Sequence, residues 1–142
     1  MTKQKAIICD LDGTLALIEH RSPYDASTAM DDELNLPVAN VIAVYANQDY
    51  VLVRLILLTG REEKYRGVTE RWLEKHDIVH YDALYMRKTG DRCKDFVYKK
   101  EIYERHIQEK YDVLFVLEDR DQVVSMWREP GLTCFQVAYG DF

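Results

Sequence analysis

Cysteine is scarce in this sequence. The 142 residues contain Cys9, Cys93 and Cys134, and no two of them have the Cys-x-x-Cys spacing. An odd number of widely separated cysteines argues against a disulfide framework and against a structural zinc site. We therefore expect a protein of a reducing compartment, the cytoplasm.

Long apolar runs are also lacking. The first run, Ala6–Cys9, has four residues before Asp10 interrupts it, which is too short for a signal peptide or a membrane span. We expect no membrane partner. No repeat, low-complexity stretch or block of like charge divides the chain. The length suits one domain, so we expect residues 1–142 to form a single domain.

Positive charge is in deficit. The chain has 19 basic and 25 acidic side chains and a formal net charge of −6. Such a protein is not expected to coat nucleic acid or an anionic membrane through its overall field.

What the sequence does contain is an alternation of strand and helix patterns. Short apolar runs predict strands near residues 5–10, 50–58, 83–86, 112–117 and 133–138. Periodic patterns predict helices from about Pro37, over 65–76, over 94–109, and before Pro130. This order predicts a three-layer, Rossmann-like α/β fold with a mainly parallel sheet of about five strands. We expect Thr59-Gly60-Arg61 to end the second strand, and residues 13–36 to be irregular and too short for a cap domain.

Acidic residues follow the predicted strands. Asp10 and Asp12 follow the first strand, and Glu118 and Asp119 end the fourth. Because the carboxyl ends of parallel strands meet at one edge, these groups should converge there with Thr59-Gly60-Arg61. Four clustered carboxylates repel one another unless a cation lies among them, and an oxygen-only set suits Mg²⁺ and hence phosphate chemistry. The alternative, that strand-end acids cap the following helices, suits Asp119 alone better than it suits three strand ends together.

The segment Asp10-Leu11-Asp12-Gly13-Thr14 resembles the nucleophile motif of the haloacid dehalogenase (HAD) superfamily of phosphotransferases. The resemblance implies that Asp10 attacks phosphorus, and that Asp12 is general acid and base and binds the metal through its backbone carbonyl. It also implies that Thr59 contacts the transferred phosphoryl group, with Thr14 and Gly60 on the substrate side. Asp119 would bind the metal directly and Glu118 through water. Many members have a second Asp where this chain has Glu118.

The residues alone leave Lys94, Lys99 and Lys100 open as the lysine of the superfamily pattern. A closer resemblance, to the 3′-phosphatase domains of bacteriophage polynucleotide kinase–phosphatases, selects Lys99 with Asp95 as its partner. The same resemblance implies that Arg21, Arg61 and Arg87 grip substrate phosphates; the alternative for each is a solvated surface charge. The segments that carry it are Lys5–Ile8, Asp12–Ala16, Arg21–Asp25, Gly90–Asp95, Lys99–Ile107, Asp119–Arg128 and Gln136–Phe142.

The implied function is a Mg²⁺-dependent phosphoric monoester hydrolase that removes 3′-phosphate from DNA or RNA ends through an aspartyl-phosphate, in a bacterial or phage-infected cell. No Gly-x-x-x-x-Gly-Lys-Ser/Thr segment occurs, so we expect the kinase half to be absent and a separate kinase or ligase to be a partner. Two alternatives stay open. One is a phosphatase of the same chemistry for a small nucleotide or sugar phosphate, and the other is a non-catalytic scaffold for a kinase or ligase.

Overall fold

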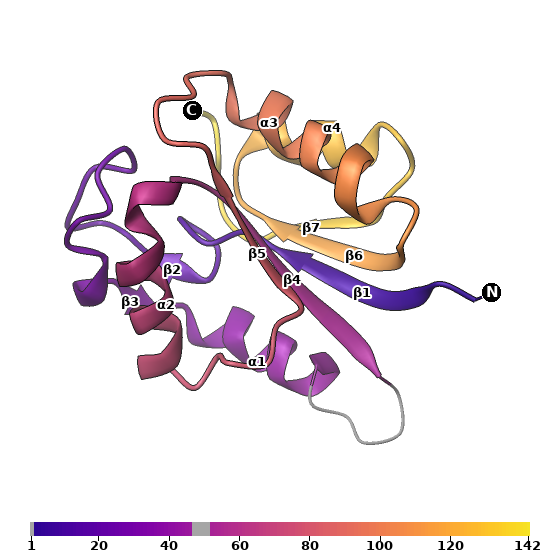
Figure 1. The fold of residues 1–142 in the computed structure, drawn as a ribbon, viewed down its shortest axis with the longest axis horizontal. Helices are drawn as coiled ribbons and strands as arrows, with labels where there is room; N and C mark the ends of the chain where they lie inside the picture. Colours follow the sequence, from indigo (N-terminus) through magenta and orange to yellow (C-terminus); the bar gives the residue numbers. More distant parts are fainter. Residues whose placement is uncertain (1, 47–51) are drawn as a thin grey trace.

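Five parallel strands form the centre of the molecule. The computed structural model describes residues 2–46 and 52–142. The sheet has the order β5-β4-β1-β6-β7, and every neighbouring pair is parallel (Figure 1). The strands are β1 (Gln4–Cys9), β4 (Val53–Glu62), β5 (Ala83–Arg87), β6 (Tyr111–Glu118) and β7 (Cys134–Gln136). The predicted α/β fold with about five mainly parallel strands is therefore confirmed.

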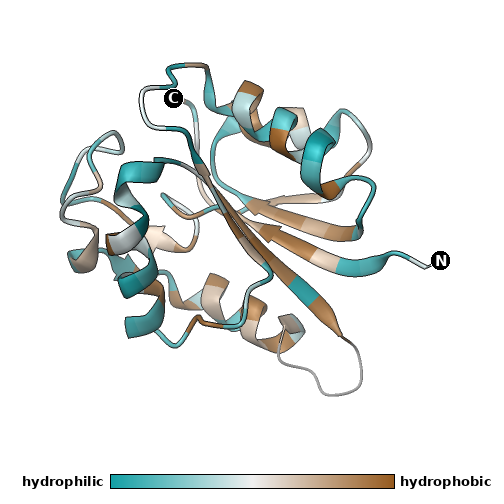
Figure 2. Ribbon diagram, viewed as in Figure 1, coloured by the Kyte–Doolittle hydropathy of each residue, from teal (hydrophilic) through white to brown (hydrophobic). Residues whose placement is uncertain are grey.

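Strand β1 lies in the middle of the sheet, and both of its faces are buried. Residues Ala6–Cys9 are fully buried, and Figure 2 shows the apolar character of the central strands. Ile7 and Cys9 face one core, whereas Ala6 and Ile8 face the other. A short run with no polar alternation is what a strand covered on both sides requires.

Two pairs of helices cover the two faces (Figure 1). On one face, α1 (Leu36–Ala46) and α2 (Arg66–Lys75) pack Val38, Ile42 and Trp72 against the sheet. On the other, α3 (Asp95–Ile102) and α4 (Asp121–Arg128) contribute Tyr98 and Trp127 to the second core. In the part of the chain that the structure describes, no helix combines the length and apolar character needed to cross a membrane.

The second strand differs from its prediction at both ends. Tyr50 and Val51 lie outside the described residues, and β4 begins at Val53. Thr59-Gly60-Arg61 does not end the strand, which continues to Glu62. The prediction was wrong because the ladder with β5 becomes irregular after Leu58 and then resumes, with Glu62 opposite Arg87. A glycine inside a strand marks such an irregularity as readily as an end.

Other boundaries are shorter than predicted. The last strand covers Cys134–Gln136 instead of 133–138, and the helix predicted to reach residue 109 is α3 followed by a π-helical turn at Tyr103–Ile107. The segment predicted to be irregular contains a 3-10 turn, Ala29–Asp31, and a two-stranded antiparallel ribbon. The ribbon consists of β2 (Ala16–Leu17) and β3 (Glu33–Leu34).

Candidate active site

The acidic residues of the first and fourth predicted strands meet at the carboxyl edge of the sheet. Asp10 follows β1, Glu118 ends β6 and Asp119 comes directly after it. One carboxylate oxygen from each of the three lies within 4.8 Å of the others, and all three side chains are buried. We call these three residues the acidic cluster. The predicted convergence of these strand ends is therefore present.

Burial controls the protonation of the acidic cluster. It raises the pKa of Asp10, with a further contribution from the charge of Glu118. It also raises the pKa of Glu118, although Lys99 opposes the shift. Burial and the charge of Asp10 raise the pKa of Asp119 to about 7. Thr14 spans two members, because its hydroxyl donates to Asp10 Oδ2 at 2.9 Å and lies 3.3 Å from Asp119 Oδ1.

Lys99 is the cation that contacts the acidic cluster. It is 1% exposed, and its Nζ donates to Asp10 Oδ1 at 2.8 Å and to Glu118 Oε2 at 2.9 Å. Asp95, one helical turn earlier, holds the same Nζ at 3.3 Å. Burial opposes the charge on Lys99, but the carboxylates of Asp10, Asp95 and Glu118 outweigh it and raise the lysine's pKa. The other two candidate lysines, Lys94 and Lys100, are exposed.

The donors of the acidic cluster fit a hard divalent cation. All are carboxylate oxygens, and within residues 2–46 and 52–142 the three carboxylates face a single ammonium, Lys99, which contacts Asp10 and Glu118. Burial raises the pKa of Asp10 and of Asp119, and the neighbouring carboxylates add to both shifts, so a further cation at this position would favour the ionised forms. The arrangement is one that Mg²⁺ or a similar oxygen-binding ion would stabilise.

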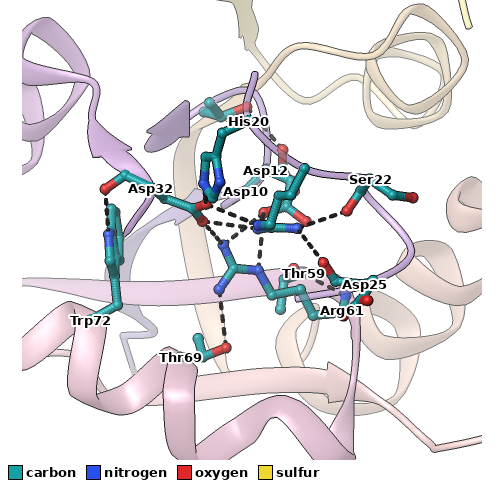
Figure 3. Close-up of polar contacts among 12 residues, drawn as sticks. Asp10, Asp12, His20, Ser22, Asp25, Asp32, Thr59, Arg61, Thr69 and Trp72 are labelled. Atoms are coloured by element: carbon teal, nitrogen blue, oxygen red, sulfur yellow. Dashed lines mark hydrogen bonds and ion pairs between the residues drawn. The ribbon is translucent and has the colours of Figure 1, made fainter. Parts of the chain in front are cut away.

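The carboxylate of Asp12 does not join the acidic cluster but lies among arginines (Figure 3). Its Oδ1 accepts hydrogen bonds from Arg21 Nη2 at 2.9 Å and from Arg61 Nη2 at 2.7 Å and Nε at 3.0 Å. Asp32 contacts the same two guanidinium groups through Oδ2, at 2.8 and 3.0 Å. We call Asp12, Asp32, Arg21 and Arg61 the arginine cluster. It fixes the position of Asp12 next to the acidic cluster.

Asp32 is the residue that the sequence did not reveal. It is 3% exposed. Its Oδ1 also accepts a hydrogen bond from Arg21 Nε and contacts His20 Nε2. Its backbone carbonyl accepts a hydrogen bond from the Trp72 indole at 2.9 Å. Its sequence neighbours Asp31 and Glu33 are exposed. No pattern in one sequence separates the buried member of this acidic triplet from the other two, and all three lie in the segment 13–36 that the sequence predicts to be irregular.

The arginine cluster leads to a first prediction. Asp32→Asn removes the charge that two buried guanidinium groups share, so we expect the free energy of unfolding to fall by about 3 kcal/mol. We also expect slower turnover, because Arg21 and Arg61 would lose the anchor that aligns them on Asp12. Urea unfolding and phosphate release check both effects. Asp31→Asn, an exposed neighbour, is the matched control, and equal losses in the two variants would contradict the role of Asp32.

Arg87 at the end of β5 bonds to Gly60 in β4 and so connects these two strands next to the site. Arg87 Nε donates to the Gly60 carbonyl at 3.1 Å, its Nη1 donates to the Cys93 carbonyl, and its Nη2 contacts Asp95 Oδ1 at 3.2 Å. A Cβ on residue 60 would lie 2.4 Å from Asp95 Oδ1, so only glycine allows Asp95 this close to β4. Next to it, the Thr59 hydroxyl accepts the Arg61 backbone N–H at 3.1 Å.

None of the three predicted arginines is a solvated surface charge. Their side chains are 4%, 0% and 9% exposed for Arg21, Arg61 and Arg87. Two of them contact Asp12 and Asp32, and the third contacts Asp95 and two backbone carbonyls. The structure thus brings every residue proposed from the sequence to one edge of the sheet, in two adjoining groups.

The end of β7 and the segment that follows it bond to the backbone of Glu118 and Asp119. Gln136 Nε2 donates to the Asp119 carbonyl at 3.0 Å, and Val137 N–H donates to the Glu118 carbonyl at 3.0 Å. Gly140 accepts from Asp121 N–H at 2.9 Å and lies so close that a Cβ there would be 1.9 Å from the Asp119 carbonyl oxygen. This packing gives the distinctive sequence at 136–142 a structural role, which is to fix the backbone that carries Glu118 and Asp119.

Known proteins resemble the chain over almost all of its length. The family model of the polynucleotide kinase PNKP phosphatase domain matches residues 4–142. A curated relative from Autographa californica nuclear polyhedrosis virus, named "Putative bifunctional polynucleotide kinase/RNA ligase", is 35% identical over 126 residues, which are 88% of this chain and 18% of that protein.

Solved structures agree with this match. A chain in the structure of the Pnkp1/Rnl/Hen1 complex is 54% identical, with a TM-score of 0.93 over 99% of this chain and 48% of that chain. A chain in the structure of the Pnkp1/Rnl/Hen1 RNA repair complex gives the same identity and TM-score and is covered to 44%. The present chain therefore spans less than half the length of these relatives. The match of the family model over residues 4–142 shows that the chain belongs to the family of polynucleotide kinase phosphatase domains.

Proposed function

We propose that this chain removes phosphate from the 3′ ends of DNA or RNA, with Mg²⁺, through an aspartyl-phosphate on Asp10. The observation that carries the proposal is the acidic cluster in contact with a buried lysine, at the edge of the sheet where Asp12 and Thr59 also lie. Membership of the phosphatase-domain family supports the reaction class. The Pnkp1/Rnl/Hen1 RNA repair complex that contains a similar chain supports polynucleotide ends as the substrate.

In the first half of the reaction, a carboxylate oxygen of Asp10 attacks phosphorus and the bond from phosphorus to the 3′ oxygen breaks. Asp12 donates a proton to the leaving oxygen. In the second half, Asp12 takes a proton from a water whose oxygen attacks phosphorus, the bond from phosphorus to the Asp10 oxygen breaks, and inorganic phosphate leaves as the Asp10 carboxylate is restored. Arg21 and Arg61 bond to Oδ1 of Asp12, and none of the described residues donates to its Oδ2. Oδ2 is the oxygen we assign to proton transfer.

Asp10, Asp119 and the Asp12 backbone carbonyl would bind Mg²⁺ directly, with Glu118 acting through water. The bound ion supplies a Lewis acid that withdraws charge from the phosphoryl oxygens. Lys99 and Thr59 are the protein groups that would contact the nucleophile and the phosphoryl group. Lys99 contacts the nucleophile from the side of Glu118 and Asp95, and Thr59 has a hydroxyl proton for which no described residue serves as acceptor.

Partners follow from the relatives. The viral relative carries the name of a kinase/RNA ligase, and a chain like this one occurs with Rnl and Hen1 in one complex. We infer that the 142 residues serve as one phosphatase domain that acts beside a kinase or ligase.

Phosphate release across a panel of substrates tests the proposal. The purified protein with Mg²⁺ is compared on 3′-phosphorylated DNA and RNA oligonucleotides, on 3′-phosphorylated mononucleotides and on sugar phosphates. We expect the highest kcat/KM on the oligonucleotides. A large preference for mononucleotides or sugar phosphates would contradict the polynucleotide assignment, and no release from any ester would support a scaffold.

The high pKa of Asp119 predicts how metal binding depends on pH. Because Asp119 in the folded protein has a pKa of about 7, it carries a proton below that pH and is ionised above it. Mg²⁺ must displace this proton, so its apparent affinity should rise by about tenfold between pH 6 and pH 8. Titration of activity and of thermal stability with Mg²⁺ at both pH values measures the change. An affinity that did not vary with pH would contradict Asp119 as a ligand.

A further inference from the structure

Positive charge concentrates in the segment between β5 and α3. Residues 87–94 contain four basic residues and one acid, Asp91, and so carry a net charge of +3. Since the whole chain has −6, the remaining residues sum to −9. Three of the four cations, Lys88, Arg92 and Lys94, are exposed. We call residues 88–94 the basic loop.

The exposed cations of the basic loop have no acidic partner. Among residues 2–46 and 52–142, no Asp or Glu oxygen lies within 4.0 Å of the charged nitrogens of Lys88, Arg92 or Lys94. Some exposed cations elsewhere do pair, as Lys64 does with Glu62 and Arg105 with Glu101, whereas Lys3, Lys5 and Lys110 have no acidic partner among the described residues. The basic loop therefore differs from other unpaired cations in its position beside the candidate active site, where its three cations are available to an anionic ligand.

The basic loop has a defined conformation. Gly90 N–H donates to Glu62 Oε2 at 3.1 Å, and the Thr89 hydroxyl accepts from Lys64 N–H at 3.0 Å. Within the loop, Asp91 Oδ1 accepts from Cys93 N–H at 2.9 Å. Cations on a loop that is already ordered lose less conformational entropy when they bind a ligand.

Both ends of the basic loop lie at the candidate active site. At one end, Arg87 bonds to Gly60 and to the Cys93 carbonyl. At the other, Asp95 contacts Lys99, which contacts Asp10. Two successive contacts, Asp95 to Lys99 and Lys99 to Asp10, therefore connect the residue after the loop to the nucleophile. In Figure 1 the loop leads into α3 at the end of the sheet where the strands finish.

We propose that the basic loop binds backbone phosphates of the nucleic-acid strand whose 3′ end enters the active site, an inference that rests on the proposed function. A terminal phosphate held at Asp10 leaves the next phosphates of the same strand outside the acidic cluster. The exposed cations of the basic loop, beside the acidic cluster, are placed to contact these phosphates, and such contacts do not depend on base sequence. A mononucleotide or sugar phosphate has no further phosphate to reach the loop, so the loop separates polymer ends from small esters.

The test compares two triple variants that remove the same charge. Lys88→Ala/Arg92→Ala/Lys94→Ala changes the basic loop. Lys3→Ala/Lys5→Ala/Lys110→Ala is the matched control, because these exposed lysines precede or begin β1 and β6 at the opposite edge of the sheet. Binding is measured by fluorescence anisotropy with a labelled single-stranded oligonucleotide that ends in a 3′-hydroxyl and cannot be turned over, between 50 and 200 mM salt.

We expect the loop variant to bind the oligonucleotide about tenfold more weakly at the lowest salt. The slope of log affinity against log salt should become shallower by about 2, from three contacts at about 0.7 each. The control should bind like the wild type. In activity assays, the loop variant should lose a similar factor in kcat/KM on a 3′-phosphorylated oligonucleotide and nothing on a 3′-phosphorylated mononucleotide.

Each other result has one meaning. Unchanged binding by the loop variant, an equal loss in the control, or no binding by the wild type would overturn the proposal. Weaker binding by the loop variant, with a wild type that releases no phosphate from oligonucleotides, would support the loop as a polynucleotide surface and contradict the proposed phosphatase function.

Discussion

Asp10→Asn should reduce phosphate release from a 3′-phosphorylated oligonucleotide by about 10⁴-fold or more. The amide cannot attack phosphorus, and the substitution also removes one of the three carboxylates that would hold the metal ion. We expect the fold to remain, because the carbonyl oxygen of the new amide can still accept a hydrogen bond from Thr14 or Lys99. The substitution also removes one of three neighbouring buried carboxylates and so reduces the repulsion among them. Phosphate release and thermal unfolding, measured on the same preparation, check both expectations.

The matched control for Asp10→Asn is Asp112→Asn, an exposed carboxylate near the start of β6 at the opposite edge of the sheet. It should have wild-type activity. A radiolabelled 3′-phosphate substrate should leave an acid-stable label on the wild type and none on the Asp10→Asn variant. Residual turnover above about one per cent, or label on the variant, would overturn Asp10 as nucleophile.

Lys99→Met should have the largest effect on stability. The buried ammonium contacts Asp10, Asp95 and Glu118. Its removal takes the counter-charge from Asp10 and Glu118 and leaves Asp95 with Arg87. Breaking a buried ion pair by deleting one partner costs about 3–5 kcal/mol, and we expect a loss of this size in the free energy of unfolding at pH 8 without divalent cations. Activity should also disappear, because the ammonium contacts the nucleophile.

The loss caused by Lys99→Met should depend on pH. The pKa values of Asp10 and Glu118 are already raised by burial, and they rise further when the ammonium is absent. A carboxylate with a raised pKa binds more protons in the folded than in the unfolded state, so the variant regains stability relative to the wild type as the pH falls toward 5.5. Urea unfolding at pH 8 and pH 5.5 in a chelator measures this.

Lys100→Met is the control for Lys99→Met. Lys100 follows on the same helix but is exposed, so its loss should change stability by less than about 0.5 kcal/mol. The charge interpretation of Lys99 would be wrong if the two variants were equally destabilised, or if the cost of Lys99→Met were the same at both pH values.

The sequence predicted the acidic cluster well because two local signals agree. Apolar runs marked β1 and β6 as buried strands, and acids at their ends marked the edge where ligands bind in parallel sheets. The assignment of Lys99 needed the family resemblance. Residue patterns left Lys94, Lys99 and Lys100 open, although Asp95 one helical turn before Lys99 could orient its ammonium, and the packing of α3 against the sheet is what buries Lys99.

Asp32 shows where such reasoning ends. Its role depends on the chain between β2 and β3 folding back so that one acid of a polar triplet meets Arg21 and Arg61, which lie 11 positions before it and 29 positions after it. Periodicity does not encode a contact of that kind. The continuation of β4 through Gly60 was missed for a related reason, since the close approach of Asp95 that requires this glycine comes from a distant segment.

The central position of β1 has a consequence for the order of events in folding. Asp10 can meet Lys99 and Glu118 only when β1 is paired with β6, whose residues lie more than 100 positions later in the chain. Pairings this distant in sequence form slowly, because loop closure must precede the contacts that reward it. A partly folded chain in which β1 and β6 are not paired therefore has no complete active site. On refolding, the recovery of activity should coincide with the slowest phase seen by tryptophan fluorescence.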